Sequence, residues 1–436
     1  MDIKEAVDYV YKSYMIVKDD LDWGMKDSEK RNPEYSRPLL LDSDFENTIL
    51  VTGSKGKGSV TNMVSCILGQ KYTVGTMTSP HIINFNERIK VNGEEISDLD
   101  FSNIMEELKP LIDKIQSNLR PGEYISPMGI QAAVAMRYFK YKNVDVSVYE
   151  CGKGVKYDDA NNIKHAYAVI NPIFNEHMRE LGDTVVDIAK DKVHIIDGNK
   201  KYVYVADQKA EVYSVIEERA GQYGVELKRY GKDFSCDKIR YTSSGMVFDV
   251  DIGGDLYKDV KIPLLGDHQA KNFALAMSLS KDYMGLLPDL RNVLDGLEYH
   301  GRMEIINSKP LVILDASIHA ENADYVKKTL SHLGLSKVNV IIGIPDDKDY
   351  LGVAKTIADL ADEIILTRSS NKHYYFSDRQ KEVLANNGIS AIATSNFIDA
   401  FSIAKKNNNP IIILGTTSLI SDVISNRDNL GLGIFA

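Results

Sequence analysis

The sequence predicts an α/β protein that has two mainly parallel sheets and a small antiparallel β region between them. Short aliphatic strands alternate with helical stretches over residues 48–206, and a second series of this kind begins near residue 303. Alternating strands and helices of this length are typical of parallel sheets with helices on both faces. Over residues 225–263, apolar and polar side chains alternate instead, which indicates an antiparallel meander.

The first series begins after an expected opening helix at residues 1–24 and a polar, irregular stretch at 25–47. The helix expected at 127–141 is the plainest, because Ile130, Val134 and Tyr138 fall on one face. Strands are expected at 48–52, 72–77, 144–150, 166–171 and 201–206.

The rest of the chain completes the first domain with the meander and a helix and then predicts a second domain. In the meander, segments 238–242 and 246–250 flank a turn at Ser243–Gly245, and a helix follows at 270–284. We expect a larger α/β domain over residues 1–300 and a smaller Rossmann-like α/β domain over 301–436. Nearly continuous aliphatic runs, typical of buried parallel strands, predict the strands of the second domain at 311–316, 338–344, 363–367 and 410–415.

Composition narrows the class of protein. The 436 residues carry a net charge of −10, which argues against non-specific binding to nucleic acid or to an anionic membrane surface. Cys66, Cys151 and Cys236 have no zinc-site spacing and favour a reducing compartment. No apolar run approaches the ~20 residues of a membrane span, and the N-terminus lacks a signal-peptide core. We expect a cytoplasmic protein.

A glycine-rich turn between the first strand and an apolar helical pattern is the most informative motif. Its glycines let several backbone N–H groups point inward, and the following helix adds its positive dipole end, so the turn suits phosphate oxygens. Lys57 can reach the outer phosphates, and Ser59 can offer its hydroxyl to Mg²⁺. The alternative is a tight turn with incidental basic residues. The turn comprises Gly53, Ser54, Lys55, Gly56, Lys57, Gly58 and Ser59.

Two further candidates lie at strand ends. Glu150 ends an apolar strand, where α/β folds place their ligands and where a carboxylate commonly serves Mg²⁺. Ser79 follows the 72–77 run and is a possible metal or phosphate ligand. The alternatives are a solvent-facing strand end for Glu150 and a plain Ser-Pro turn for Ser79.

His177 and Lys192 are less distinctive by themselves. His177 lies just beyond the strand expected at 166–171, and Lys192 lies on an amphipathic helical stretch. A lone loop histidine is commonly a surface residue and a helical lysine is commonly solvated, so neither pattern alone establishes a function.

Together these segments resemble the Mur ligase superfamily, most closely its folylpolyglutamate synthase branch. GSKGKGS at 53–59 is similar to the family's GTNGKGS, and TSPH at 78–81 to its TSPHL. ECGKG at 150–154, followed by Asp158, resembles EVGLGGRLDATN, and the segment at 176–184 resembles DHT-WLGDT. The matches run through most of the chain in the family's order.

The resemblance implies an ATP-dependent ligase that activates a carboxylic acid as an acyl phosphate and joins it to an amino acid. ATP and Mg²⁺ are the implied cofactors. The lysine matching Lys192 is often carbamoylated in this family. The implied catalytic residues are Lys57, His177 and Lys192; the implied ATP-binding residues are the 53–59 turn with Asn272, Arg302 and Asp315; and the implied metal ligands are Ser59, Ser79, Glu150, His177 and Lys192.

Some positions depart from the family pattern. Ile318 and His319 stand where the family has His-Asn, and Lys55 replaces an asparagine. Residues 25–47 and 126–129, which by resemblance shape the acyl-substrate side, also differ. Glutamate addition to a folate and ligation of another acid therefore both remain open. An ATP-binding protein without ligase chemistry and a switch-type ATPase are alternatives from other classes. The expected partners are small acids and amino acids, and the expected state is a monomer or small homo-oligomer.

Overall fold

The computed structural model describes residues 1–21, 25–41, 44–242, 245–295 and 299–433. These residues form two compact units. The larger unit contains Met1–Asp237, Asp249–Val260 and Lys271–Leu294, and the smaller one contains Lys238–Phe248, Lys261–Ala270 and Asp295–Ala436. The domain division at 300/301 stays a prediction, as does the naming of the two parts.

The larger unit contains an eight-stranded sheet in the order β4-β3-β2-β5-β1-β6-β7-β8. The six strands from β2 to β8 run parallel, whereas β3 and β4 pair antiparallel at one edge. The four central strands β2, β5, β1 and β6 are almost fully buried, as their aliphatic sequences predict. The strands are β1 (Thr48–Thr52), β2 (Val74–Met77), β3 (Ile89–Val91), β4 (Glu94–Glu95), β5 (Val146–Glu150), β6 (Tyr167–Ile170), β7 (Tyr202–Val205) and β8 (Leu227–Arg229).

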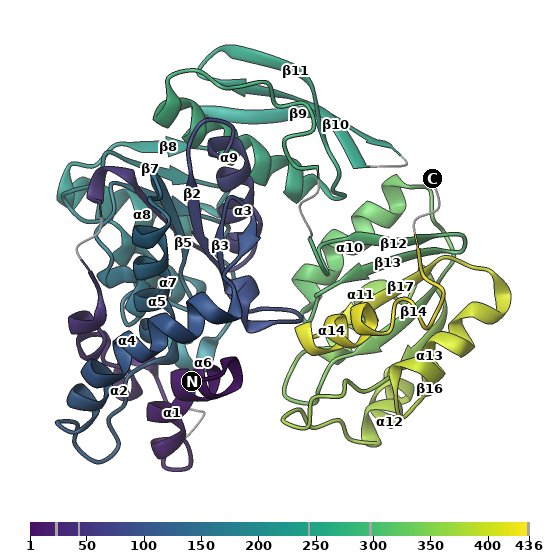
Figure 1. Cartoon of the computed structure of the whole chain (residues 1–436). Coiled ribbons are helices and arrows are strands. Elements are labelled where there is room, and N and C mark those ends of the chain that lie inside the picture. The colour runs from purple at the N-terminus through teal and green to yellow at the C-terminus, as the bar shows by residue number, and fades with distance from the viewer. Residues whose placement is uncertain (22–24, 42–43, 243–244, 296–298, 434–436) are drawn as a thin grey trace. The chain divides into compact units, whose positions relative to one another are not determined.

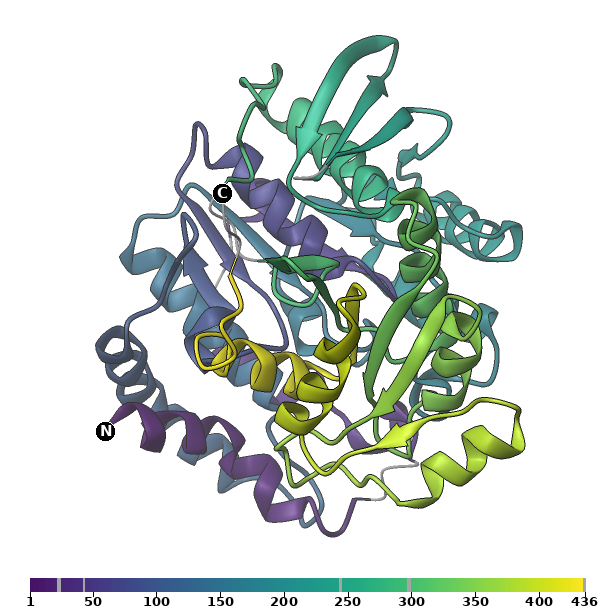
Figure 2. The same ribbon diagram turned by 90° about the vertical axis from the view of Figure 1, so that its right-hand side faces the viewer.

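Helices flank this sheet, and Figures 1 and 2 both show α1 beside α4. The helix predicted at 127–141 is confirmed as α5, in which every residue from Gly129 to Phe139 is buried. The opening helix ends at Val17, earlier than the predicted residue 24, and residues 22–24 lie outside the described part. The helices are α1 (Ile3–Val17), α2 (Asp27–Lys30), α3 (Lys57–Leu68), α4 (Asp98–Gln116), α5 (Pro127–Tyr141), α6 (Met178–Leu181), α7 (Val185–Lys192), α8 (Ala210–Tyr223) and α9 (Asp267–Met284), with 3-10 turns η1 (Pro33–Tyr35), η2 (Arg37–Leu39), η3 (Phe45–Asn47), η4 (Phe85–Arg88), η5 (Asp159–Asn162) and η6 (Val193–Ile195).

The region predicted as a meander is only partly one. β9 (Phe234–Thr242), β10 (Gly245–Ile252) and β11 (Asp255–Ile262) form a three-stranded sheet in the order β11-β10-β9. The start of the predicted meander was wrong, because β8 pairs parallel with β7 and extends the large sheet. Ser243 and Ser244, in the predicted turn, lie outside the described residues.

The smaller unit contains a six-stranded sheet in the order β12-β13-β17-β14-β15-β16. Its four aliphatic strands were predicted and are parallel, whereas the antiparallel edge strand β12 was not predicted. The elements are β12 (Glu304–Ser308), β13 (Leu311–Asp315), β14 (Val338–Gly343), β15 (Ala361–Leu366), β16 (Ile392–Ala393) and β17 (Ile411–Gly415), with α10 (Ala320–His332), α11 (Tyr350–Ile357), α12 (Arg379–Asn386), α13 (Phe397–Ala404), α14 (Thr417–Ser425) and the turn η7 (Lys405–Asn407). Throughout the described part of the chain, each helix is too short or too polar to cross a membrane.

Candidate active site

The turn between β1 and α3, together with the first turn of α3, forms what we call the phosphate loop (residues 53–59). Gly53 has φ +133° and Gly56 has φ +84°, which are backbone conformations that favour glycine. A Cβ on Gly53 would lie 2.5 Å from the Cβ of Asn171, and one on Gly56 would lie 2.6 Å from Asn171 Nδ2. Backbone geometry and close packing therefore both require glycine here. The open N-terminus of α3 provides N–H groups for an anion.

The chain just beyond β6 holds the phosphate loop in place. The Ser54 amide donates to Pro172 O at 2.8 Å, and Asn171 Nδ2 donates to Lys55 O at 3.2 Å. Lys57 Nζ donates to Gly53 O at 3.1 Å, so the lysine is folded over its own loop. No role for Asn171 was predicted, although its place directly after a buried strand is the signal that also selected Glu150.

Glu150 lies beside the phosphate loop, because β5 pairs with β1 and sets Glu150 opposite Val51. Its carboxylate is buried, and Oε2 accepts a hydrogen bond from the Ser79 amide at 2.9 Å. A Cβ on Gly58 would lie 3.3 Å from the same oxygen. The structure thus brings together Glu150, Ser79 and the first turn of α3, where the buried Ser59 lies.

His177 lies in the loop after β6 in a left-handed conformation with φ +48°. Desolvation of the ring, together with nearby Lys153, lowers the pKa of His177 to about 4, while Glu176 opposes this effect. A neutral imidazole is the form that binds metals. The His177 ring is therefore uncharged at neutral pH, which suits a metal ligand better than a group that must take up a proton.

Lys192 is fully buried at the end of α7 and joins three separate segments. Its Nζ donates to Gly53 O at 3.0 Å and to Lys153 O at 2.5 Å, and it forms an ion pair with Glu176 Oε1 at 3.2 Å. Burial lowers the pKa of Lys192, and Glu176 opposes that effect. These contacts connect Lys192 to the phosphate loop. Its carbamoylation and its metal-binding role stay predictions.

The residues near the loop can be tested for fit to Mg²⁺. In the described ranges, no cluster of three or more His, Cys, Asp and Glu side chains is arranged to hold a metal ion. Mg²⁺, however, commonly uses only one or two protein carboxylates and takes its remaining ligands from phosphates and water. Glu150 and the hydroxyls of Ser59 and Ser79 are hard oxygen donors of the kind that Mg²⁺ prefers, so this donor set fits.

The remaining predicted nucleotide contacts are divided between the units. In the larger unit, Asn272 borders the phosphate loop, because a Cβ on Gly56 would lie 3.0 Å from its side-chain amide. In the smaller unit, Asp315 accepts from the Met303 amide at 2.9 Å and from the Ser317 hydroxyl. The Ala316 amide donates to Gly301 O at 2.9 Å, so Arg302 lies near Asp315 within that unit.

A cavity of about 290 Å³ lies against the loop that follows β5. We call it the tyrosine cavity, because Tyr11, Tyr14 and Tyr124 line it. Arg31, also in its wall, forms an ion pair with Asp159 at 3.3 Å. The other lining residues that matter here are Asp27, Lys30, Met128, Lys153 and Asp158.

Buried charges in the wall of this cavity were not predicted. Arg31 Nη2 lies 3.9 Å from Asp158 Oδ2 and Nη1 lies 3.7 Å from Asp27 Oδ2. Burial raises the pKa of Asp158 to about 6, although Arg31 opposes this. Only the match of Asp158 to the family motif pointed to this cluster, because Arg31 comes from a segment that departs from the family pattern.

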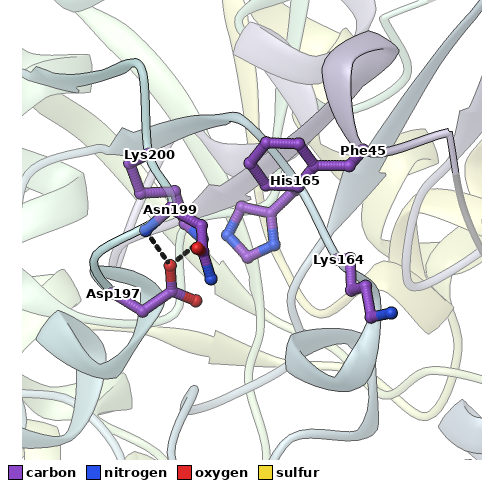
Figure 3. Close-up of a pocket in the computed structure, with 6 residues that line it drawn as sticks. All are labelled: Phe45, Lys164, His165, Asp197, Asn199 and Lys200. Atoms are coloured by element: carbon purple, nitrogen blue, oxygen red, sulfur yellow. Dashed lines mark hydrogen bonds and ion pairs between the residues drawn. The ribbon is translucent and has the colours of Figure 1, made fainter.

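A second cavity of about 330 Å³ lies at the opposite edge of the same sheet (Figure 3). Its lining residues precede β1, β6 and β7, so they are at the amino ends of these strands. His165 is buried between Ile163 O at 2.7 Å and Ile195 O at 3.3 Å, and Lys200 pairs with Asp197 at 2.8 Å. This cavity contains none of the predicted site residues.

Comparison with known proteins agrees with this geometry. Residues 102–280 match the family described as Mur ligase middle domain. The chain is 30% identical over 318 residues to the folylpolyglutamate synthase of Lacticaseibacillus casei, covering 70% of this chain and 73% of that protein. The chain belongs to the folylpolyglutamate synthase-like branch of the Mur ligase family.

Two further proteins extend this similarity over nearly the whole chain. The dihydrofolate synthase/folylpolyglutamate synthase of Bacillus subtilis is 29% identical over 393 residues, covering 86% of this chain and 88% of that one. The Mycobacterium tuberculosis folylpolyglutamate synthase, solved with ADP and AMPPCP, superposes with a TM-score of 0.83 at 24% identity, over 93% of this chain and 96% of that chain. The predicted fold class is thus confirmed, and the chain is an ATP-dependent acid–amino acid ligase of the Mur family.

Proposed function

We propose that this ligase joins a small carboxylic acid to the amino group of an amino acid through an acyl phosphate, with release of ADP and phosphate. The observation that supports this most is that the phosphate loop, Glu150, Ser79 and Lys192 meet at one edge of one sheet. The carboxyl edge of a parallel sheet is where α/β proteins bind their ligands. The roles of the individual residues are part of the proposal.

In this proposal, the N–H groups of the phosphate loop and the Lys57 ammonium bind the phosphates of ATP. Asn272 contacts the nucleotide beside the phosphate loop. The nucleotide-binding roles that the resemblance implies for Arg302 and Asp315 stay predictions. Glu150, with the hydroxyls of Ser59 and Ser79, holds Mg²⁺, and His177 is a ligand for a second ion. When bound, Mg²⁺ neutralises phosphate charge that would otherwise repel the acid.

The two chemical steps follow from the nature of the substrates. A carboxylate oxygen attacks the γ-phosphorus, the bond from that phosphorus to the bridging oxygen breaks, and ADP leaves. The amine nitrogen then attacks the acyl carbon, and the bond from that carbon to the phosphate oxygen breaks. The amide and inorganic phosphate result, and the phosphate takes the proton that the amine loses. Phosphoryl transfer needs alignment and charge neutralisation more than covalent help, which is what Lys57 and the loop supply.

We place the acid substrate in the tyrosine cavity. Its wall combines residues 27–31 and 126–128, the segments that by resemblance shape the acyl side and that depart from the family pattern. The relatives are named for dihydrofolate and folylpolyglutamate synthesis, so a pteroate or folate with glutamate is the first pair to test. The three tyrosines in the wall suit a flat, partly apolar head group, and the departures favour an acid other than a folate.

We also propose a cytoplasmic location, a monomer or small homo-oligomer, and no nucleic-acid partner. The net charge of −10 and the small number of cysteines support the location and the absence of nucleic acid.

The test is a product survey with purified full-length protein. The protein is incubated with ATP, Mg²⁺, an acid panel that includes folate, and the twenty amino acids; ADP release and product masses are measured. We expect ADP release that depends on both an acid and an amino acid, and a product that is lighter by one water than their sum. ADP release that ignores every acid and amino acid, or nucleotide binding without product, would contradict the proposal.

A further inference from the structure

Lys153 lies where three parts of the site meet. It follows Glu150 by three residues in the loop after β5, and its carbonyl accepts the hydrogen bond from Lys192 Nζ. Its own Nζ lies 2.9 Å from Glu180 Oε1 on α6, and its side chain lines the tyrosine cavity. One residue thus borders the cavity, the segment that carries His177, and the lysine that contacts the phosphate loop.

The positive charge of Lys153 is a departure of this chain from the family motif. The motif that the segment resembles, EVGLGGRLDATN, has leucine where Lys153 stands, so an apolar side chain is replaced by a cation. The charge also acts on the neighbouring segment, because Lys153 contributes to lowering the pKa of His177 and of Glu180. It therefore changes the electrostatics between the cavity and the predicted metal ligand.

The other cations in the wall of the cavity are paired within it. Arg31 lies between Asp27, Asp158 and Asp159, and Lys30 lies 3.7 Å from Asp27. Lys153 differs, because its partner Glu180 is not part of the cavity wall. The Lys153 side chain is 37% exposed, whereas that of Glu180 is 14% exposed. A lysine ammonium has three N–H donors, so one can bind Glu180 while the other two are available to a ligand.

We propose that Lys153 binds the reacting carboxylate of the acid substrate and makes this enzyme specific for acids whose head group fills the tyrosine cavity. The inference rests on the proposed function and adds to it a specificity-determining residue. Because Lys153 and the three tyrosines line the same cavity, a head group among Tyr11, Tyr14 and Tyr124 can present its carboxylate to the Lys153 ammonium. The ammonium offsets the repulsion between this carboxylate and the triphosphate, and Glu180 is its positioning residue.

The test compares three variants by binding, without turnover. The probes are pteroate, 4-aminobenzoate and 4-hydroxycinnamate, each paired with its primary amide, titrated calorimetrically into protein with Mg²⁺ and AMPPCP. Lys153→Leu installs the family's residue, Lys153→Arg keeps the charge, and Lys156→Leu removes an exposed charge three residues away that does not line the cavity. AMPPCP affinity, measured first, verifies that each variant is folded.

We expect wild type to bind at least one acid about tenfold or more tightly than its amide, because a charge-assisted hydrogen bond is worth at least that factor. Lys153→Leu should reduce this preference to within about twofold, whereas Lys153→Arg and Lys156→Leu should keep most of it.

A preference that survives in Lys153→Leu, or no acid preference in wild type, would overturn the inference. If the preference depends on Lys153 but the product survey finds no amide, the proposed function fails and only the contact of Lys153 with a carboxylate ligand stands. If amide forms but Lys153→Leu keeps the preference, only this inference fails.

Discussion

Lysine and histidine side chains lie both where the parallel strands of the eight-stranded sheet end (the carboxyl edge) and where they begin (the amino edge), but their partners differ. At the carboxyl edge, Lys192 contacts Gly53, which is 139 residues away in the sequence, together with Lys153 and Glu176. At the amino edge, Lys200 pairs with Asp197, three residues away in its own loop, and that carboxylate also accepts from the Asn199 amide (Figure 3). Buried charge at the amino edge is thus neutralised locally, whereas at the carboxyl edge it joins segments that are distant in the sequence.

This difference identifies the features that indicate a ligand-binding site. Burial lowers the pKa of His165 at the amino edge to about 4, the same value that His177 has at the carboxyl edge. A shifted pKa therefore does not separate the two edges. Left-handed glycines, an open helix N-terminus and long-range partners occur together at the carboxyl edge, and these are the features that indicate ligand binding.

The largest effect should come from Lys57→Ala. It removes the cation that we assign to the phosphates, so ADP release in the ligase assay should fall about 100- to 1,000-fold. The matched control at the other edge is Lys164→Ala, which should keep activity within about twofold. Equal losses in the two variants would break the comparison.

Glu150→Gln should come next, with a loss of about 100-fold at fixed Mg²⁺. The substitution keeps the size of the side chain but removes the charge that we assign to Mg²⁺ binding. The half-saturating Mg²⁺ concentration should therefore rise, as a titration of activity against Mg²⁺ would measure. A lower rate with an unchanged Mg²⁺ requirement would contradict the assigned role.

The loss of stability on replacing a buried lysine should also differ between the two edges. Lys192→Met leaves the buried Glu176 carboxylate and two carbonyls without their donor, so unfolding in urea should be easier by about 3–5 kcal/mol. Lys200→Met should cost about 1 kcal/mol, because the Asp197 side chain is 47% exposed and water can replace its partner. Similar urea midpoints for both variants would show that the long-range ties matter less than we infer.

The smallest effect concerns pH. The folded-state pKa of His165, about 4, lies below the usual value of 6.5, so the unfolded chain binds more protons between these values. Stability should therefore fall as the pH falls from 6.5 towards 4, and His165→Gln should make this fall shallower. Urea denaturation at several pH values would measure both slopes, and identical slopes would contradict the inferred neutral, buried histidine.

Features that a local sequence pattern encodes could be predicted from the sequence. Buried parallel strands appear as aliphatic runs, and the phosphate loop appears as glycines between a strand and a helix, so β1, β5 and the 53–59 turn were predictable. The strand β8 was assigned to the wrong sheet, because its three residues pair with β7 and carry no signal of that partner.

Partners distant in the sequence could not be predicted either. Arg31 meets Asp159 across 128 residues, and Lys153 meets Glu180 only once α6 is in place. Such contacts depend on tertiary packing, which leaves no periodic pattern in the chain.

The central claim is that ATP activates the acid by forming a bond from its carboxylate oxygen to phosphorus. The most direct measurement uses an acid found in the product survey, labelled with ¹⁸O in its carboxylate, and determines the mass of the released phosphate. We predict that one labelled oxygen passes to inorganic phosphate for each amide formed. Phosphate that remains free of label while amide accumulates would contradict the account.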